Sequence, residues 1–340
     1  MNKPLVSVVM PAYNCERFIA RAIESIIAQT YENWELIITE DGSTDNTYRI
    51  ANKYRNERIH IYQTPSNSGT AFIPRRTSFI NSKGEYVISV DSDDYLEGNY
   101  ISDCIEKIQR SNADSCCGKM VMIDDSGSLL DIPTIPDSSF DFNQIMSGRE
   151  AFLLTVPRYR IAMNGFISKR EIWQKAWDDY DKTGRHGVHD DENLGKLMLM
   201  YSEKVAFCDV IHYYTINTNS ITHVFNDKAF DWMLSNEVIL KIVKEYYGDG
   251  HEFHQTELSD YYSYVHVTEF LAQSLGSLDS SDLPRFFMRM KEWHNRINWK
   301  NVRGYDGTVK WLIGKNFNLR WFCKLAQHRA IKYLKYIIIT

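Results

Sequence analysis

Short apolar runs alternate with segments of helical periodicity along the first hundred residues of the chain. The runs that predict buried strands are Leu5–Met10, Trp34–Thr39, Arg58–Gln63 and Glu85–Val90. The spacings between them predict a helix from Phe18 to Ile27, a second helix through Tyr48, Ile50 and Tyr54, and a third over residues 71–82. Strand and helix in this rhythm predict parallel strands joined by right-handed crossovers, and therefore an open α/β sheet.

Polar residues precede the first two helices. Asn14 is predicted to cap the first helix, and Ser43 with Thr44 the second, because short polar side chains accept hydrogen bonds from free backbone N–H groups. The last part of the chain differs, since apolar residues at helical spacing predict helices over 230–247, 261–275 and 283–297. We therefore expect a helical C-terminal region over residues 226–340.

Polar residues also follow three of the predicted strands. The turns are Pro11-Ala12-Tyr13-Asn14, Glu40-Asp41-Gly42-Ser43 and Asp91-Ser92-Asp93-Asp94. In open α/β sheets, ligands bind beyond the C-terminal ends of the strands, so these turns are expected to converge on one crevice. Neither G-x-G-x-x-G nor G-x-x-x-x-G-K-[ST] occurs in the chain, which argues against a dinucleotide-binding Rossmann site and a P-loop.

The third turn holds three carboxylates, those of Asp91, Asp93 and Asp94. Like charges at the edge of an apolar core require a cation. Carboxylate oxygens suit a hard ion, Mg²⁺ or Mn²⁺, which commonly completes its shell with substrate phosphates. The alternative is a solvated acidic turn that caps a helix over residues 98–110.

Several segments together carry a family resemblance. They are VSVVMPAYN, WELIITEDGSTDNT, the stretch from Asn67 and Gly69 to GEYVISVDSDDYL, and the later HDDEN and HYYTINTNSIT. In combination they resemble an inverting family 2 glycosyltransferase of the GT-A type, as found in bacterial surface-polysaccharide synthesis. The resemblance implies a Rossmann-like mixed sheet flanked by helices over residues 1–225, with a donor half (1–125) and an acceptor half (126–225), followed by the helical extension.

The resemblance also implies which residues hold the donor. Tyr13 would lie against the uracil of a UDP-sugar and Asp41 would accept a hydrogen bond from the base, while Asp91 would contact ribose or sugar. The remaining residues expected at the nucleotide are Pro11, Ala12, Asn14, Ser43, Arg75 and Ser92. The open alternatives are an ordinary core or surface aromatic for Tyr13 and a turn residue for Asp41.

Around Arg75 the chain departs from the family, which often has an Ala-Arg-Asn triplet after the Asn-x-Gly motif. Here the stretch is NSGTAFIPRRTSF, and Arg75 is the better candidate for a donor contact, with a surface salt bridge as the alternative. Asp93 is expected to ligate the metal that neutralises the diphosphate leaving group. His223 could complete the metal shell or bind phosphate, although a lone histidine is more often an ordinary core or surface residue.

Asp191, within His189-Asp190-Asp191-Glu192-Asn193, matches the place of the family's catalytic base. A carboxylate there would remove the acceptor's hydroxyl proton as the anomeric carbon is attacked, with inversion. The alternative is an acidic first turn that complements the helix dipole, which is the role expected for Asp190 and Glu192. The acceptor pocket is expected between residues 145 and 190, near Asn164, Gly165 and Trp173.

The composition and the charge of the chain limit which class of protein it can be. The 340 residues are 44% hydrophobic and 24% charged with a net charge of −5, which is typical of a globular chain and gives no basic excess for nucleic acid. From Arg296 onward, however, ten Lys and Arg face Asp306 alone, a net charge of +9. Because Trp, Phe and Ile accompany them, we expect either contact with an anionic membrane surface or packing on the catalytic domain.

The six cysteines form no C-x-x-C pair, so reduced thiols in the cytoplasm are expected. Cys116 and Cys117 are predicted to point to opposite faces of one strand and are given no role. No apolar stretch is long enough for a signal sequence or a membrane span, so a cytoplasmic protein, peripheral at most on the inner face of the membrane, is expected.

We therefore predict a metal-dependent inverting glycosyltransferase that uses Mn²⁺ or Mg²⁺ and a nucleotide-sugar donor, with a glycan or lipid-linked glycan as acceptor. Two alternatives stay open. A sugar nucleotidyltransferase would need a Gly-rich basic loop after the first strand, which PAYNCERF lacks. A noncatalytic nucleotide-sugar-binding module would not need Asp191. A glycosidase, which also uses two carboxylates, would need neither nucleotide nor metal.

Overall fold

The computed structural model describes residues 3–156, 164–184, 190–216, 225, 227–274, 278–279 and 281–303. These residues fall into two compact units, an α/β unit that ends at about residue 216 and a helical unit that follows it. The predicted boundary at residue 225 lies next to residues 217–224, which are outside the described part of the chain.

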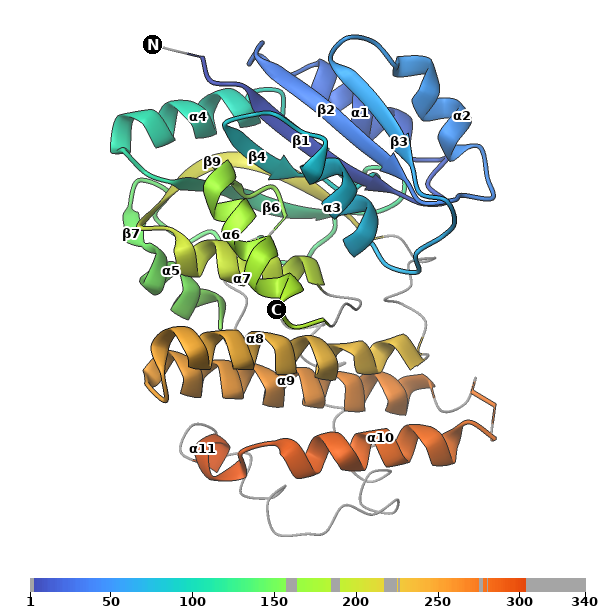
Figure 1. Cartoon of the computed structure of the whole chain (residues 1–340), viewed down its shortest axis with the longest axis vertical. Coiled ribbons are helices and arrows are strands. Elements are labelled where there is room, and N and C mark those ends of the chain that lie inside the picture. The colour runs from blue at the N-terminus through green and yellow to red at the C-terminus, as the bar shows by residue number, and fades with distance from the viewer. Residues whose placement is uncertain are drawn as a thin grey trace. The chain divides into compact units, whose positions relative to one another are not determined.

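The α/β unit contains one mixed sheet of nine strands among its described residues (Figure 1). Their order is β3-β2-β1-β4-β8-β6-β9-β5, with β7 also paired to β9. The strands are β1 (Val6–Ala12), β2 (Trp34–Glu40), β3 (Ile59–Gln63), β4 (Tyr86–Ser89), β5 (Tyr95–Leu96), β6 (Ser115–Ile123), β7 (Ile145–Ser147), β8 (Ile167–Lys169) and β9 (Lys204–Thr215).

The parallel half of the sheet is as the sequence predicts. Strands β3, β2, β1 and β4 are parallel neighbours, and their carboxyl ends therefore lie at one edge of the sheet. The other half is mixed, because β8 runs antiparallel to β4 and β6, while β5 and β7 run antiparallel to β9. Short strands of two or three residues such as β5, β7 and β8 carry too little periodicity to be recognised from sequence. The predicted mixed α/β sheet flanked by helices is confirmed.

Helices cover both faces of this sheet. They are α1 (Ile19–Ile27), α2 (Thr47–Ala51), the 3₁₀ turn η1 (Asn52–Tyr54), α3 (Phe72–Ile80), α4 (Tyr100–Ser111), α5 (Gly148–Thr155), α6 (Arg170–Asp181) and α7 (Asp190–Tyr201). Every residue of β1 and β2 is buried, because helices lie on both sides of these central strands. Aromatic rings join α3 to α6, with centroids 4.9 Å apart for Phe72 and Trp177.

The second unit is helical, as predicted. It consists of the 3₁₀ turn η3 (Asp227–Phe230), α8 (Asp231–Tyr247), α9 (His251–Ser274), α10 (Leu283–Arg296) and α11 (Trp299–Arg303). Helix α9 begins ten residues before its predicted start at Tyr261. The core of this helical unit contains several aromatic side chains. Within it, the buried carboxylate of Asp260 accepts a hydrogen bond from Trp293 Nε1 at 2.9 Å.

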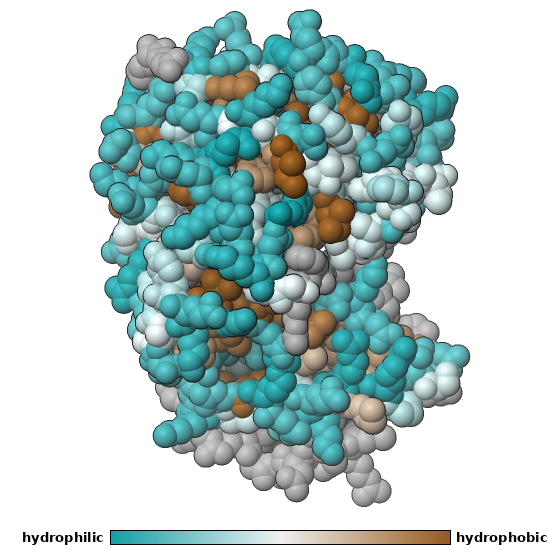
Figure 2. Space-filling view, in the orientation of Figure 1, coloured by the Kyte–Doolittle hydropathy of each residue, from teal (hydrophilic) through white to brown (hydrophobic). Residues whose placement is uncertain are grey.

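No helix of the described residues is long and apolar enough to cross a bilayer. On the face shown in Figure 2 the side chains are mostly hydrophilic, and apolar residues form small, separate patches. The basic, aromatic tail of residues 304–340 lies outside the described residues, so the predicted membrane contact stays a prediction.

Candidate functional site

The turns after β1 and β2 are joined by hydrogen bonds between their side chains and backbones. The backbone N–H of Asn14 donates to Ser43 Oγ at 3.0 Å, and that of Thr44 donates to Asn14 Oδ1 at 2.9 Å. The predicted capping roles are therefore wrong: α1 begins at Ile19 and α2 at Thr47, and neither helix has a side-chain cap bond. Asn14 instead adopts a positive φ of 45°, and its polar groups bridge the two turns.

Two more pairs extend this connection along the chain. Cys15 N–H donates to Thr47 Oγ1 at 2.8 Å, and Glu16 N–H donates to Asp45 Oδ2 at 3.0 Å. These bonds join residues 14–16 to residues 43–47, and we call this pair of turns the β1–β2 platform. Of the residues predicted to bind nucleotide here, Pro11 and Ala12 are buried within β1, whereas the side chain of Tyr13 is 41% exposed, so its ring is available for stacking.

Asp41 lies at the end of β2, buried and facing the loop that follows β3. Its carboxylate accepts hydrogen bonds from Thr64 Oγ1 at 2.7 Å, from Ser68 Oγ at 2.7 Å and from Ser68 N–H at 3.0 Å. Gly42 has a φ of +70°, and a Cβ there would lie 2.8 Å from the backbone nitrogen of Asn67. Asp41 and Gly42 thus hold the loop after β3 against the strand ends. Asp41 is therefore a hydrogen-bond acceptor for that loop and not only a turn residue.

Arg75 is a buried partner of Asp91 and not a surface residue. The guanidinium of Arg75, 3% exposed, donates to Asp91 Oδ1 at 2.8 Å and to Ser89 Oγ at 3.0 Å. Burial raises the pKa of the Asp91 carboxyl, Arg75 lowers it, and the neighbouring Asp94 and Asp191 raise it further. The alternative of a surface salt bridge is excluded, since the guanidinium reaches from α3 to Ser89 and Asp91 at the end of β4. The predicted contact of Arg75 with the donor stays a prediction.

Asp191 lies on the first turn of α7 and lines the same pocket as Ser89 of β4. With Arg75, Ser89 and Asn164 it lines one pocket, whose apolar wall includes Phe166 and Leu194. The fold thus brings Asp191 into one pocket with Arg75 and Ser89, which lie more than 100 residues earlier in the chain. Trp173 contributes to the wall from the core, because it is buried and its indole N–H donates to Val87 O.

The neighbours of Asp191 fit different roles. Glu192 pairs with the buried Lys196 at 2.6 Å, one turn along α7, so it does more than complement the helix dipole. The side chain of Asp190 and residues 217–224, including the predicted ligand His223, lie outside the described residues.

Asp93 and Asp94 differ in their surroundings although they are adjacent. Asp94 is fully buried; His212 Nε2 lies 2.9 Å from its Oδ2, and Thr215 N–H donates to its Oδ1 at 2.9 Å. Asp93 and Ser92 complete the turn, with Ser92 buried and Asp93 partly exposed. The sequence indicated neither the pairing of Asp94 with His212 nor the strand β5, since a single histidine in a strand carries no signal for a distant partner.

Tyr214 on β9 shows that the carboxylates share one region. Burial raises the pKa of its phenol, and Asp94, Asp93, Asp91 and Asp191 each raise it further. Four carboxylates therefore lie close enough to one side chain to act on it. These carboxylates carry the hard oxygen donors that a divalent cation such as Mg²⁺ or Mn²⁺ prefers, although no three of them bring their ligand atoms within 4.8 Å of one another among the described residues. Tyr214 itself is a site residue that the sequence reasoning missed.

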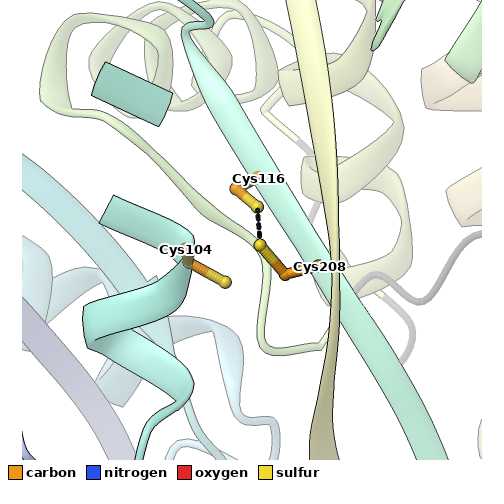
Figure 3. A group of neighbouring side chains, drawn as sticks. All are labelled: Cys104, Cys116 and Cys208. Carbon is orange, nitrogen blue, oxygen red and sulfur yellow. Dashed lines mark hydrogen bonds between the residues drawn. The ribbon is translucent and has the colours of Figure 1, made fainter. Parts of the chain in front are cut away.

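A second cluster consists of cysteine thiols, which are soft sulfur ligands, in contrast to the hard carboxylate oxygens. Cys104, Cys116 and Cys208 point towards one another between α4, β6 and β9, with their sulfur atoms within 4.8 Å (Figure 3). All three are free and buried, and Cys117 lies on the other face of β6, as predicted. Burial raises the pKa of the Cys104 and Cys116 thiols, which opposes thiolate formation. Soft sulfur ligands also do not suit the hard cation expected at the aspartates.

Comparisons with known proteins bear on the family and the fold. Residues 7–165 match the family model described as "Glycosyl transferase family 2", which spans β1 to β4, the aspartate turn and the start of the acceptor side. Residues 7–165, just under half of the chain, are thus similar to glycosyltransferase family 2. Its fold is similar to that of the crystal structure of S. aureus TarS 1–349 in complex with UDP-GlcNAc, with a TM-score of 0.64 at 18% identity, over 87% of this chain and 82% of that one. The predicted GT-A fold is thereby confirmed.

Two curated relatives share part of their length with this chain. It is 28% identical to "Glycosyltransferase GlyA" of Streptococcus pneumoniae over 239 residues, 67% of this chain and 32% of the relative. It is 35% identical to "Glycosyltransferase GlyG" of the same organism over 124 residues, 36% of this chain and 41% of the relative. The chain thus spans less than half the length of either relative.

Proposed function

We propose that this chain is an inverting glycosyltransferase that transfers a sugar from a UDP-sugar to a glycan or lipid-linked glycan acceptor. The observation that carries the proposal is the meeting of Asp191 with Arg75 and Ser89 in one pocket, beside the aspartate turn after β4. It brings a carboxylate suited to be a base next to residues placed for the donor. The family match of residues 7–165 supports the same reaction class.

The donor would bind on the platform formed by the β1 and β2 turns. The exposed ring of Tyr13 offers a face for base stacking, and Asp41 is an acceptor for a ring N–H. Each Asp41 oxygen already accepts bonds from Thr64 or Ser68, so these hydroxyls would fix the carboxylate's orientation towards the base. Structures of TarS with UDP-GlcNAc and with UDP support a uridine nucleotide.

Asp93 would hold the divalent cation, with His223 as a further candidate, and the cation would neutralise the diphosphate leaving group as a Lewis acid. The residues of the chain do the rest. Arg75 holds Asp91 in place at 2.8 Å, where Asp91 can accept a hydrogen bond from a ribose or sugar hydroxyl. Asp191 takes the proton of the acceptor hydroxyl, and the attack on the anomeric carbon comes from the face opposite the diphosphate.

The pocket that Asp191 shares with Asn164 has room for about one water molecule, so the acceptor would lie outside it, beside Asp191. The name of one relative supports a surface-glycan acceptor, since TarS of Staphylococcus aureus, 32% identical over 137 residues, is a poly(ribitol-phosphate) β-N-acetylglucosaminyltransferase. The net charge of +9 from Arg296 onward supports a peripheral position at an anionic membrane surface, where lipid-linked acceptors reside.

A thermal-shift screen of UDP-, GDP- and dTDP-sugars with Mn²⁺ tests the donor class. We expect UDP-sugars to raise the melting temperature most, because a ligand that binds only the folded state stabilises it by mass action. Adding EDTA in excess of Mn²⁺ should remove most of the shift, since the diphosphate would lose its bridge to Asp93. If none of the three nucleotide classes shifts the transition, the proposed donor is wrong.

A further inference from the structure

The turn that holds Asp93 is supported from behind by strand β9, which lies outside the segment matched by the family model. Strand β5, directly after the turn, pairs with β9 so that Tyr95 lies opposite Tyr213 and Leu96 opposite His212. The rings of Tyr95 and Tyr213 stack with centroids 4.4 Å apart. The aspartate turn is therefore held by a strand more than a hundred residues later in the chain.

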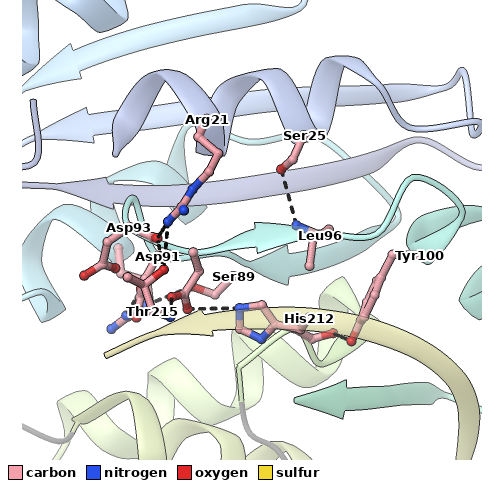
Figure 4. A network of polar contacts seen from close by, with 12 residues as sticks. Arg21, Ser25, Ser89, Asp91, Asp93, Leu96, Tyr100, His212 and Thr215 are labelled. Atoms are coloured by element: carbon pink, nitrogen blue, oxygen red, sulfur yellow. Dashed lines mark hydrogen bonds and ion pairs between the residues drawn. The ribbon is translucent and has the colours of Figure 1, made fainter. Parts of the chain in front are cut away.

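Thr215, the last residue of β9, fixes the backbone of Asp93. Its hydroxyl donates to the carbonyl oxygen of Asp93 at 2.5 Å, and Arg21 Nη2 donates to the same carbonyl and to Thr215 Oγ1, both at 2.9 Å. Figure 4 shows Arg21 reaching from α1 to this contact. Two donors from two elements, Arg21 of α1 and Thr215 of β9, thus share the carbonyl oxygen of Asp93 and are bonded to each other, which restrains the Asp93 backbone.

Asp94 and His212 form the second half of the support. The Asp94 carboxylate accepts the backbone N–H of Thr215 and, on its other oxygen, the Nε2–H of His212. The proton is placed on Nε2 because a carboxylate can only accept. His212 Nδ1 has no hydrogen-bond partner among the described residues, so Asp94 is what orients the ring.

The space around His212 is closed as well. A Cβ on Gly165, whose φ is +77°, would lie 3.3 Å from His212 Nδ1 and 2.7 Å from Tyr100 Oη. Tyr100 in turn donates from its hydroxyl to Gly165 O at 2.8 Å. A larger residue at position 165 would therefore press on Tyr100 and on His212.

We propose that Thr215, with the Asp94–His212 pair, is a positioning element that presents the Asp93 carboxylate to a divalent cation. This inference rests on the proposed function, in which Asp93 holds that cation. Groups that orient a ligand without touching the metal typically change its affinity by about 10- to 100-fold when they are lost. Here the oriented part is the backbone from which the Asp93 side chain extends, and none of the supporting groups needs to reach the metal.

The test compares Thr215→Val with Thr215→Ser in the full-length protein. Valine keeps the shape but loses the hydroxyl that bonds Asp93 O, whereas serine keeps the hydroxyl. We expect Mn²⁺ affinity in the presence of UDP, read from the electron paramagnetic resonance signal of free Mn²⁺, to fall about tenfold in Thr215→Val and to stay near wild type in Thr215→Ser. Affinity for UDP without metal should be unchanged in both, which separates positioning from collapse of the site.

Two further variants make the test specific. His212→Leu should weaken Mn²⁺ binding like Thr215→Val, and His212→Gln, which can still donate to Asp94, should recover part of the loss. Thr155→Val removes a buried hydroxyl bond to Ala151 O within α5 and serves as the matched control, with unchanged Mn²⁺ affinity. Wild-type Mn²⁺ affinity in Thr215→Val would overturn the positioning role alone. Failure of the wild-type protein to bind Mn²⁺ with UDP would instead overturn the proposed metal role, and this inference with it.

Discussion

Replacing Asp191 by asparagine is expected to lower the rate of sugar transfer by about 10²- to 10⁴-fold, which is the usual contribution of a general base. Asparagine keeps the size and the hydrogen-bonding reach of the side chain on α7 but cannot accept the hydroxyl proton. The pocket with Arg75 and Ser89 should keep its shape. The measurement is the initial rate of UDP release from the UDP-sugar and an acceptor, followed with a coupled assay at saturating donor.

Two controls make this result informative. UDP affinity should be the same in Asp191→Asn and wild type, because Asp191 is expected to act on the acceptor and not on the nucleotide. Asp178→Asn removes an exposed carboxylate on the neighbouring helix α6 and should leave the rate unchanged. A transfer rate in Asp191→Asn within a fewfold of wild type would remove Asp191 from the mechanism and would favour a noncatalytic nucleotide-sugar-binding module.

Replacing Arg75 by methionine is expected to destabilise the protein by about 3 kcal/mol at neutral pH. Removing one partner of a buried ion pair leaves an uncompensated charge and typically costs about 3–5 kcal/mol. We expect a loss at the lower end of this range, because 25% of the Asp91 side chain is exposed to solvent, whereas only 4% of the Arg75 side chain is. The free energy of unfolding from urea titrations measures the loss, and the double variant Arg75→Met/Asp91→Asn should recover part of it.

The loss in Arg75→Met should also depend on pH with a definite sign. Burial raises the pKa of Asp91 in the folded state, and removing Arg75, which lowers it, raises it further. A carboxyl whose folded pKa lies above its unfolded value binds protons more tightly when folded, so the variant's stability should fall as pH rises through the folded pKa. The destabilisation should therefore be small in acid and largest above the folded pKa of Asp91. A loss that is equal at all pH values would mean that Asp91 is not the group left uncompensated.

The parts of the site at the ends of parallel strands could be predicted from sequence for a physical reason. Asp41 and Asp91 directly follow buried strands, and the carboxyl ends of such strands must meet at one edge of the sheet. Asp191 was placed by the resemblance alone, because nothing in its local pattern says which strand end it would lie beside. The pocket that it shares with Arg75 is a property of the folded chain.

Other features depended on tertiary contacts that leave no local signal. Asn14 and Ser43 are residue types that often cap helices. Here their side chains accept hydrogen bonds from backbone N–H groups of the neighbouring turn instead, so the capping prediction is wrong. Asp94 and His212 are 118 residues apart, and their pairing follows from the register of β5 on β9. The three thiols are likewise gathered by α4, β6 and β9, and no spacing in the chain announces them.

The central claim is that the aspartate turn and the β1–β2 platform together bind a metal-bridged uridine diphosphate. Isothermal titration of the full-length protein with UDP, in Mn²⁺ and again in EDTA, tests it most directly. We expect saturable 1:1 binding in Mn²⁺, which is strongly weakened by EDTA and by Asp93→Asn but not by Asp191→Asn. No binding of UDP in Mn²⁺, or equal binding in Mn²⁺, in EDTA and in Asp93→Asn, would contradict the claim.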